Sequence, residues 1–133
     1  MTQKIPYGHQ SIDDSDISAV QAVLRSDWLT QGPAVPAFEE GLRGRCGADF
    51  AVAVSSATAA LHIACLTAGL GPGDRLWTSP NTFVASANCA RYCGAEVDFV
   101  DIDPDTWCLD TGALERKLES ASRMGRLPST GKT

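Results

Sequence analysis

The stretch AVAVSSATAALHIACLTAGLGPGD, residues 51–74, decides the fold of this chain. Its first four residues form an apolar run that predicts a buried strand, and residues 55–58 interrupt that run with small and hydroxyl side chains. The sequence GLGPG ends the helix that follows, because glycine tolerates a left-handed cap and proline cannot continue a helix. That helix is expected over residues 59–66, with an apolar side formed by Leu61, Ile63, Cys65 and Leu66.

A strand, a turn of small residues and a helix start together can bind an anion. Backbone N–H groups in the first helical turn are unpaired, and the helix dipole adds about half a positive charge there. Ala57, Ala59 and Ala60 leave room for a phosphate, while Ser56 and Thr58 offer hydroxyl donors or a helix cap. An ordinary turn capped by Ser or Thr explains the same residues, and the segment alone favours it. The glycine patterns of the Rossmann and P-loop turns are not present.

The composition is that of one globular domain. The chain has 133 residues, of which 44% are hydrophobic and 20% charged, and its net charge is −5. This acidic balance argues against nucleic acid and anionic membranes as partners, because no basic stripe is available to neutralise phosphates. No apolar run has the length of a membrane span, and the first ten residues lack the apolar core of a signal peptide. A cytoplasmic location is expected.

The cysteines predict reduced thiols rather than a disulfide framework or a metal site. Their count is odd and no C-x-x-C occurs. Cys89 and Cys93 share a helix face, but no histidine or third thiol is nearby in the sequence, so we expect two buried apolar side chains. The set is Cys46, Cys65, Cys89, Cys93 and Cys108.

Two helices are expected before residue 51. Ser11 and Asp14 fit the capping box S-x-x-D, which starts a helix whose inward side carries Ile17, Val20, Val23 and Leu24. A second helix contains Val35, Phe38 and Leu42 and is broken by Gly44 and Gly47. Between them, Trp28 lies in a polar loop, where it either lines a cleft or folds back onto the core.

Strands and helices alternate after residue 74. Strands are predicted over residues 75–79 and 96–103, and the helix between them is expected to start at Asn81 or Thr82 and to end at Gly94. An amphipathic helix starts at Asp110, with Leu114 and Leu118 inward. Crossover-length helices between strands predict an α/β fold with a mainly parallel sheet.

Phe83 follows the second predicted strand, at the same end of the sheet as Thr58. Ligands of parallel α/β sheets bind beyond the carboxyl ends of the strands, so Phe83 is placed to stack on a flat ligand. Taken alone, Phe83 is better explained by a core position. The convergence of the two segments at one edge favours a cofactor site.

Five motifs in order resemble the DegT/DnrJ/EryC1/StrS family of sugar aminotransferases. They are DWLTQGP (27–33), VSSATAALH (54–62), GPGD (71–74), PNTFVASAN (80–88) and VDIDPDT (100–106). Within that family they are most similar to the transaminases of pseudaminic acid biosynthesis, which aminate a UDP-linked 4-keto-6-deoxy-N-acetylamino sugar. The resemblance extends from about Tyr7 to Leu118.

This resemblance implies the aspartate-aminotransferase fold (fold type I) and pyridoxal 5′-phosphate (PLP) as cofactor. It implies a homodimer, glutamate as the amino donor and a partial PLP-binding large domain over residues 49–122, preceded by an arm and helices over residues 1–48. The cofactor phosphate is assigned to Ala57, Thr58 and Ala59, and the stacking aromatic to Phe83. The nucleotide-sugar site is assigned to the arm and loop residues Tyr7, Asp27, Trp28, Leu29 and Thr30.

The chain departs from the family at the catalytic lysine. PLP chemistry needs a Schiff-base lysine and an acid at the pyridinium nitrogen. In the family both lie downstream of the region matched here, and Lys4, Lys117 and Lys132 match no such motif; Lys117 is expected on a helix surface. We therefore expect an N-terminal fragment that is inactive alone, with a disordered tail over residues 123–133. A noncatalytic phosphate- or nucleotide-binding module, or a fragment that associates with a full-length protomer, is the alternative; a Rossmann-type nucleotide domain is disfavoured.

Overall fold

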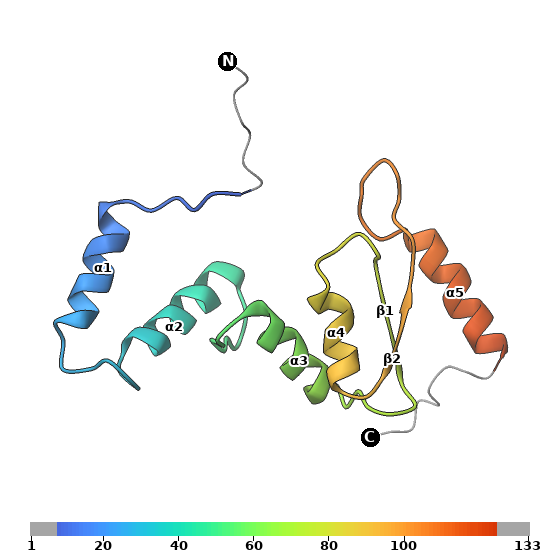
Figure 1. Ribbon diagram of the computed structural model, residues 1–133, viewed down its shortest axis with the longest axis horizontal. Helices are drawn as coiled ribbons and strands as arrows, with labels where there is room; N and C mark the ends of the chain where they lie inside the picture. Colours follow the sequence, from blue (N-terminus) through green and yellow to red (C-terminus); the bar gives the residue numbers. More distant parts are fainter. Residues whose placement is uncertain (1–7, 125–133) are drawn as a thin grey trace, which may run out of the picture. The chain divides into compact units, whose positions relative to one another are not determined.

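The computed structural model describes residues 8–124 (Figure 1). The chain divides after Ala53 into two units, which are described separately. Tyr7 and residues 125–133 lie outside the described residues. Over residues 8–124, no helix combines the length and the apolar character that crossing a membrane requires. The first unit holds α1 (Asp14–Leu24) and α2 (Ala34–Cys46), and the second holds α3 (Ala57–Thr67), β1 (Arg75–Thr78), α4 (Ala85–Tyr92), β2 (Glu96–Phe99) and α5 (Thr111–Arg123).

In the first unit, the start of α1 corrects the predicted cap. Asp13, not Ser11, caps the helix: its carboxylate accepts the N–H groups of Ser15 and Asp16, and the Asp16 side chain accepts the Asp13 N–H at 3.0 Å. Two overlapping boxes compete here, and a charged carboxylate is the stronger acceptor at the positive end of the helix dipole.

The inward side predicted for α1 is wrong. Ile17, Val20, Val23 and Leu24 are all exposed, because no described element of this unit covers them. The helix α2 runs through Gly44 rather than breaking there, and it ends at Gly47, whose φ of 64° is the left-handed conformation that glycine adopts at low cost.

The strand predicted over residues 51–54 is not formed. Val52 is 78% exposed, and the backbone N–H of Ala53 donates to the Glu39 carboxylate at 2.8 Å instead of to a neighbouring strand. A strand needs a ladder partner for its N–H and C=O groups, and no described strand pairs with this segment. The apolar run alone does not supply that partner.

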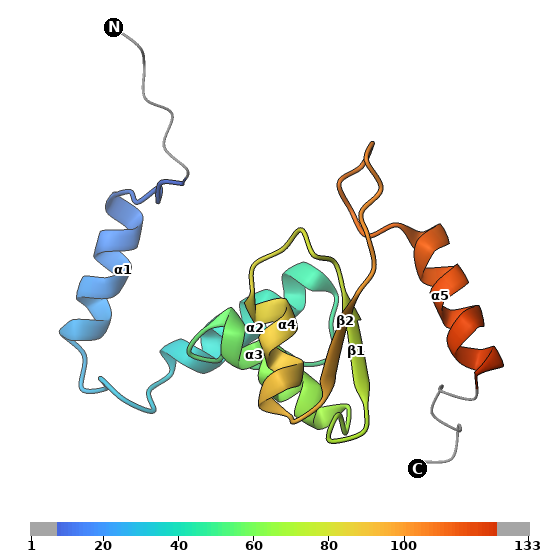
Figure 2. The same ribbon diagram turned by 45° about the vertical axis from the view of Figure 1, so that its right-hand side comes forward.

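The second unit confirms the predicted α/β arrangement. Strands β1 and β2 are parallel, with Arg75 opposite Glu96 and Trp77 opposite Asp98, and α4 forms the crossover between them. In both views α4 and α5 lie on opposite sides of the strands, and α3 packs on α4 (Figures 1 and 2). The buried residues of this three-layer unit are small: Ala85, Cys89, Ala90, Ala95, Val100 and Ala121.

Strand β2 ends earlier than predicted, at Phe99. The carboxylates of Asp101 and Asp103 accept nearby backbone N–H groups, including that of Thr106 at 3.0 Å. These local bonds compete with a strand ladder. Ile102 instead forms a single antiparallel bridge with Leu109, which closes a loop before α5.

Two helix faces differ from the prediction. On α3, Leu61, Ile63 and Leu66 are exposed, and His62 contacts the ring of Tyr92 on α4 at 5.3 Å between centroids. On α5, Leu118 is exposed and Leu114 is half-buried.

Candidate functional site

The start of α3 is the first part of the candidate site. Ser56 caps the helix: its Oγ accepts the Ala59 N–H at 3.2 Å, and its carbonyl accepts the Ala60 N–H at 3.0 Å. No described residue accepts the backbone N–H of Ala57 or Thr58. Two adjacent N–H groups are therefore available at the positive end of the helix dipole. Of the two hydroxyls considered from the sequence, the cap is Ser56, which leaves the Thr58 hydroxyl available.

The chemistry of this turn fits a phosphate. The first turn of α3 contains no acidic residue, and its side chains are those of Ala57, Thr58, Ala59 and Ala60. Backbone N–H donors, a hydroxyl and small side chains around a helix N-terminus are the donor set that phosphate anions take. The residues at this turn therefore fit the phosphate of PLP.

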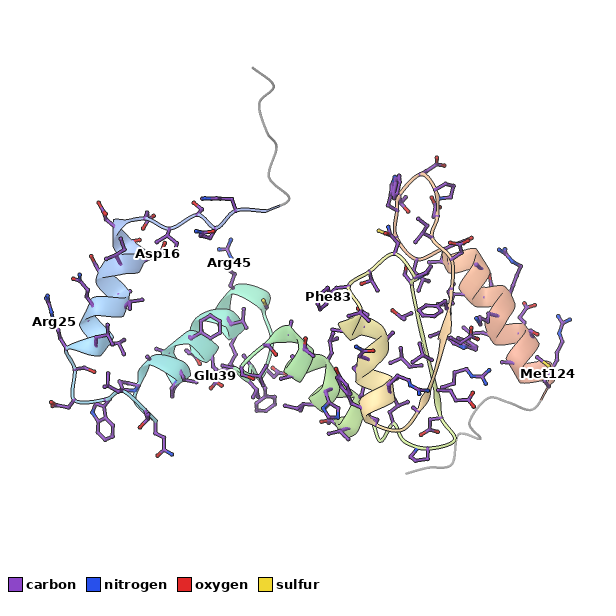
Figure 3. All side chains as sticks on the ribbon, in the orientation of Figure 1. Asp16, Arg25, Glu39, Arg45, Phe83 and Met124 are labelled. Carbon is purple, nitrogen blue, oxygen red and sulfur yellow. The ribbon has the colours of Figure 1, made fainter. Side chains whose placement is uncertain are left out.

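Phe83 is the second part of the candidate site. It precedes α4 rather than lying in its first turn, and the helix is capped by Val84 instead of Asn81 or Thr82. The Thr82 hydroxyl pairs with the Ser86 hydroxyl at 3.1 Å, so it is not used as a backbone cap. Phe83 is 75% exposed and lies at the start of α4, on the side of that helix away from the strands (Figure 3). Its ring is not part of the core.

Helices α3 and α4 pack against each other, so the turn at the start of α3 and the turn that carries Phe83 belong to one helix pair of the second unit. Their interface contains the thiols of Cys65, Cys89 and Cys93. Burial, together with hydrogen bonds and repulsion from the other two thiols, raises the pKa of Cys65 to about 11. Cys89 is buried, as predicted, and Cys93 is half-buried.

The residues assigned to the nucleotide sugar belong to the first unit or lie outside the described residues. Asp27, Trp28, Leu29 and Thr30 form an exposed loop of the first unit, and Tyr7 lies outside the described residues. Trp28 is 58% exposed and does not fold back onto a core. A Cβ at Gly32 would lie 2.6 Å from the Trp28 Cβ, so glycine is required for this close approach.

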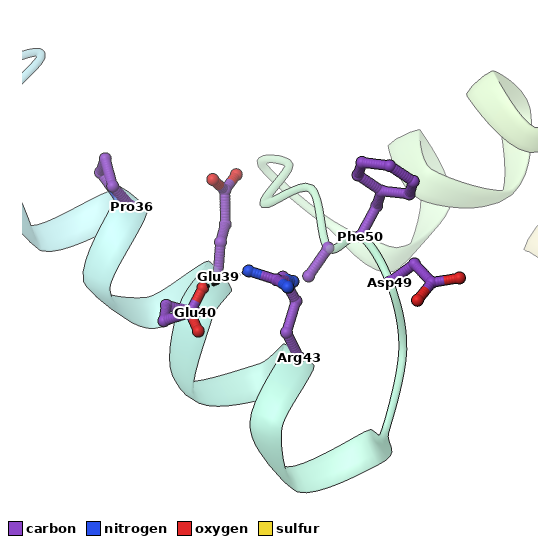
Figure 4. Close-up of a pocket in the computed structure, with 7 residues that line it drawn as sticks. Pro36, Glu39, Glu40, Arg43, Asp49 and Phe50 are labelled. Carbon is purple, nitrogen blue, oxygen red and sulfur yellow. Dashed lines mark hydrogen bonds and ion pairs between the residues drawn. The ribbon is translucent and has the colours of Figure 1, made fainter.

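A hollow of about 290 Å³ lies in the first unit and contains none of the sequence-predicted site residues. Figure 4 shows Glu39, Glu40 and Arg43 of α2 beside Phe50 at this hollow. Arg43 forms an ion pair with Glu40, and Glu39 holds the Ala53 N–H. The buried Nε of Arg43 has no hydrogen-bond partner in the described structure. The hollow lies between α2 and the chain that follows it.

Lys117 corrects another prediction, because it does not project from the helix surface. Its Nζ lies 2.8 Å from Oδ2 of Asp98 and donates to the carbonyl oxygen of Phe99 at 2.5 Å. It also lies 5.5 Å from the centroid of the Trp77 ring. The hydrogen bond from Lys117 is the main reason that the pKa of Asp98 is lowered. This lysine attaches α5 to the sheet.

The model of the DegT/DnrJ/EryC1/StrS aminotransferase family matches residues 10–124. The chain belongs to this family. It is 39% identical over 120 residues to the UDP-4-amino-4-deoxy-L-arabinose–oxoglutarate aminotransferase of Shewanella sediminis, a match that covers 90% of this chain and 31% of that protein.

Solved structures agree with this assignment. A DegT/DnrJ/EryC1/StrS aminotransferase from Brucella abortus has a TM-score of 0.77 at 32% identity, over 84% of this chain and 30% of the other. The sugar aminotransferase Spr1654 of Streptococcus pneumoniae in its PLP form has a TM-score of 0.79 at 33% identity, over 86% and 29%. The fold is therefore part of the α/β fold of PLP-dependent aminotransferases.

PLP is the cofactor of complete members of the family, since the Streptococcus pneumoniae protein has been solved in a PLP form and in a PMP form. The chain described here spans 31% of the length of the Shewanella relative.

Proposed function

We propose that this chain carries the phosphate-binding and ring-stacking part of the site of a PLP-dependent sugar aminotransferase. The observation that supports this most is the pair of unpartnered N–H groups at Ala57 and Thr58, on a helix that packs against the helix following the exposed Phe83. We assign the phosphate to these two N–H groups and to the Thr58 hydroxyl. The Ala59 side chain is small enough to permit the approach of the phosphate to the backbone.

Each residue has a stated task in this proposal. Ser56 holds the first turn of α3 by its bond to Ala59, and the N–H groups of Ala57 and Thr58 have no acceptor among the described residues. The face of the Phe83 ring covers one face of the pyridine ring and excludes water from it. When bound, PLP supplies the carbonyl group that carries the amino group from the donor to the keto sugar.

The substrate of the whole protein is proposed to be a UDP-linked 4-keto sugar, and the amino donor glutamate. The name of the Shewanella relative supports both, because it contains a UDP-linked 4-amino sugar and oxoglutarate, the keto form of glutamate. From the motifs we propose the 4-keto-6-deoxy-N-acetylamino sugar of pseudaminic acid biosynthesis, with the 4-keto pentose of the relative as the second candidate. Binding of the two sugar nucleotides, compared by calorimetry, distinguishes them.

The loop Asp27, Trp28, Leu29 and Thr30, together with Tyr7, is proposed to contact the nucleotide sugar in a homodimer located in the cytoplasm. Residues 49–122 are proposed as part of the PLP-binding domain and residues 1–48 as its arm and helices. Lys4, Lys117 and Lys132 match no Schiff-base motif, and Lys117 is held by Asp98. We therefore propose that this chain alone has no aminotransferase activity. A 4-amino sugar formed by the purified chain with glutamate and PLP would refute this point.

The binding proposal is tested by equilibrium dialysis of the chain with PLP and with pyridoxal, which lacks the phosphate. Weak binding of PLP and at least tenfold weaker binding of pyridoxal are expected, because the phosphate supplies the charge-assisted bonds. Equal binding of the two compounds, or no loss of PLP binding in Phe83→Ala, contradicts the assignment.

A further inference from the structure

Ser86 holds the turn that carries Phe83 at two points. Its backbone N–H donates to the carbonyl oxygen of Phe83 at 3.0 Å, and its Oγ lies 3.1 Å from Oγ1 of Thr82. Thr82 precedes Phe83, and Ser86 follows it by three residues. The contact between the two hydroxyls therefore closes a short loop that contains Phe83. Upstream, the Asn81 N–H donates to the Ser79 hydroxyl at 3.2 Å.

Other restraints on this turn are few. The α4 N-cap, Val84, provides no side-chain cap bond. The Phe83 side chain is exposed and is not part of any ring pair in the described structure. Because little packs around the ring, the hydrogen bonds on either side of Phe83 fix the backbone conformation of this residue. That conformation sets the direction of the Phe83 side chain.

We propose that Thr82 and Ser86 are positioning residues that fix the Phe83 ring for stacking on the pyridine ring. This inference rests on the proposed function, because it needs Phe83 to stack on PLP. Stacking requires a defined plane and offset, so an aromatic residue on a loosened turn binds a flat ligand less well. The hydroxyl pair is exposed and competes with water, so its effect is modest.

The first test uses the free protein and does not depend on PLP. Thr82→Val and Ser86→Ala each remove the hydroxyl pair, while the residue 86 N–H remains. Amide hydrogen exchange at residue 86, followed by NMR, is expected to be about threefold to tenfold faster in both variants than in the wild type. Ser122→Ala, which removes an exposed hydroxyl of α5 that has no bond in the described structure, is the matched control and leaves that rate unchanged.

The second test uses PLP as the probe. Each variant is expected to weaken binding about threefold to tenfold and to reduce the circular dichroism of the bound PLP chromophore. The double variant is expected to be no worse than either single variant, because both remove the same bond. Ser86→Thr, which keeps the hydroxyl, is expected to retain wild-type binding.

The outcomes separate this inference from the proposed function. If Ser86→Ala weakens PLP binding and Thr82→Val does not, Ser86 contacts the ligand directly and the pairing is wrong. Unchanged exchange and binding in both variants, with PLP binding still lost in Phe83→Ala, overturns the inference alone. Faster exchange in both variants without any effect of Phe83→Ala on PLP overturns the proposed function and, with it, the role assigned to the pair.

Discussion

Replacing Lys117 by Met removes one ammonium group and keeps most of the side-chain stem. The group lost is the one that contacts Asp98, the Phe99 carbonyl and the Trp77 ring. We expect this change to release α5 from the sheet and to lower the free energy of unfolding of the second unit.

The magnitude follows from these contacts. The ion pair is partly exposed, with side-chain exposures of 28% for Lys117 and 37% for Asp98, so solvent screening limits it to roughly 0.2–1 kcal/mol. The cation–π contact with Trp77 adds about 0.5–1 kcal/mol. Because one ammonium makes all these contacts, they are not additive, and a total of about 1–2 kcal/mol is expected.

The assay is urea unfolding, followed by tryptophan fluorescence and by far-ultraviolet circular dichroism. Arg123→Gln is the matched control, because it removes an exposed ion pair with Glu119 on the same helix and is expected to cost about 0.3–0.5 kcal/mol. A loss in Lys117→Met no larger than that in Arg123→Gln would refute the anchoring role.

The pKa of Asp98 adds a dependence on pH. Because its pKa is lowered below the ordinary value of 3.8, its contribution to stability is present above that pH and is lost as the pH falls through the folded-state pKa. Lys117→Met is therefore expected to reduce the loss of stability between pH 5 and pH 2, about where Asp titrates.

Three further predictions concern single positions. Ser56→Ala is expected to destabilise α3 by about 1 kcal/mol in thermal unfolding, whereas Ser56→Asp keeps the cap but weakens PLP binding, because its carboxylate repels phosphate. Gly94→Ala is expected to cost about 1–2 kcal/mol in urea unfolding, because φ is 77° and the new Cβ would lie 3.2 Å from Pro72 Cγ; a neutral result would exclude strain there. Alkylation at pH 8 with mass spectrometry is expected to modify Cys65, whose pKa is about 11, later than the exposed thiols; early labelling would contradict the protection of this half-buried thiol. The exposed thiols are Cys46 and Cys108.

The sequence supports prediction where a signal is local. The alternation around β1, α4 and β2 was predictable because turn residues and apolar runs of strand length delimit each element. The exposure of Phe83 was not, since an aromatic residue beside a helix start, taken alone, favours a core position.

Features that depend on a contact with a distant part of the chain could not be predicted from the sequence. The run at residues 51–54 has the composition of a strand but no ladder partner in the described structure, and Lys117 meets Asp98 only because β2 and α5 are brought together by the fold. The Thr82–Ser86 pair had a usable signal, because two hydroxyls at i and i+4 straddle an aromatic residue at a helix start.

Backbone NMR of the isotope-labelled chain during titration with PLP tests the central claim most directly. If the start of α3 binds the phosphate, the amide signals of Ala57 and Thr58 shift downfield. The aromatic C–H signals of the Phe83 ring shift in the same titration. Inorganic phosphate reproduces only the amide shifts. Amide signals at Ala57 and Thr58 that stay unchanged at saturating PLP would contradict the account.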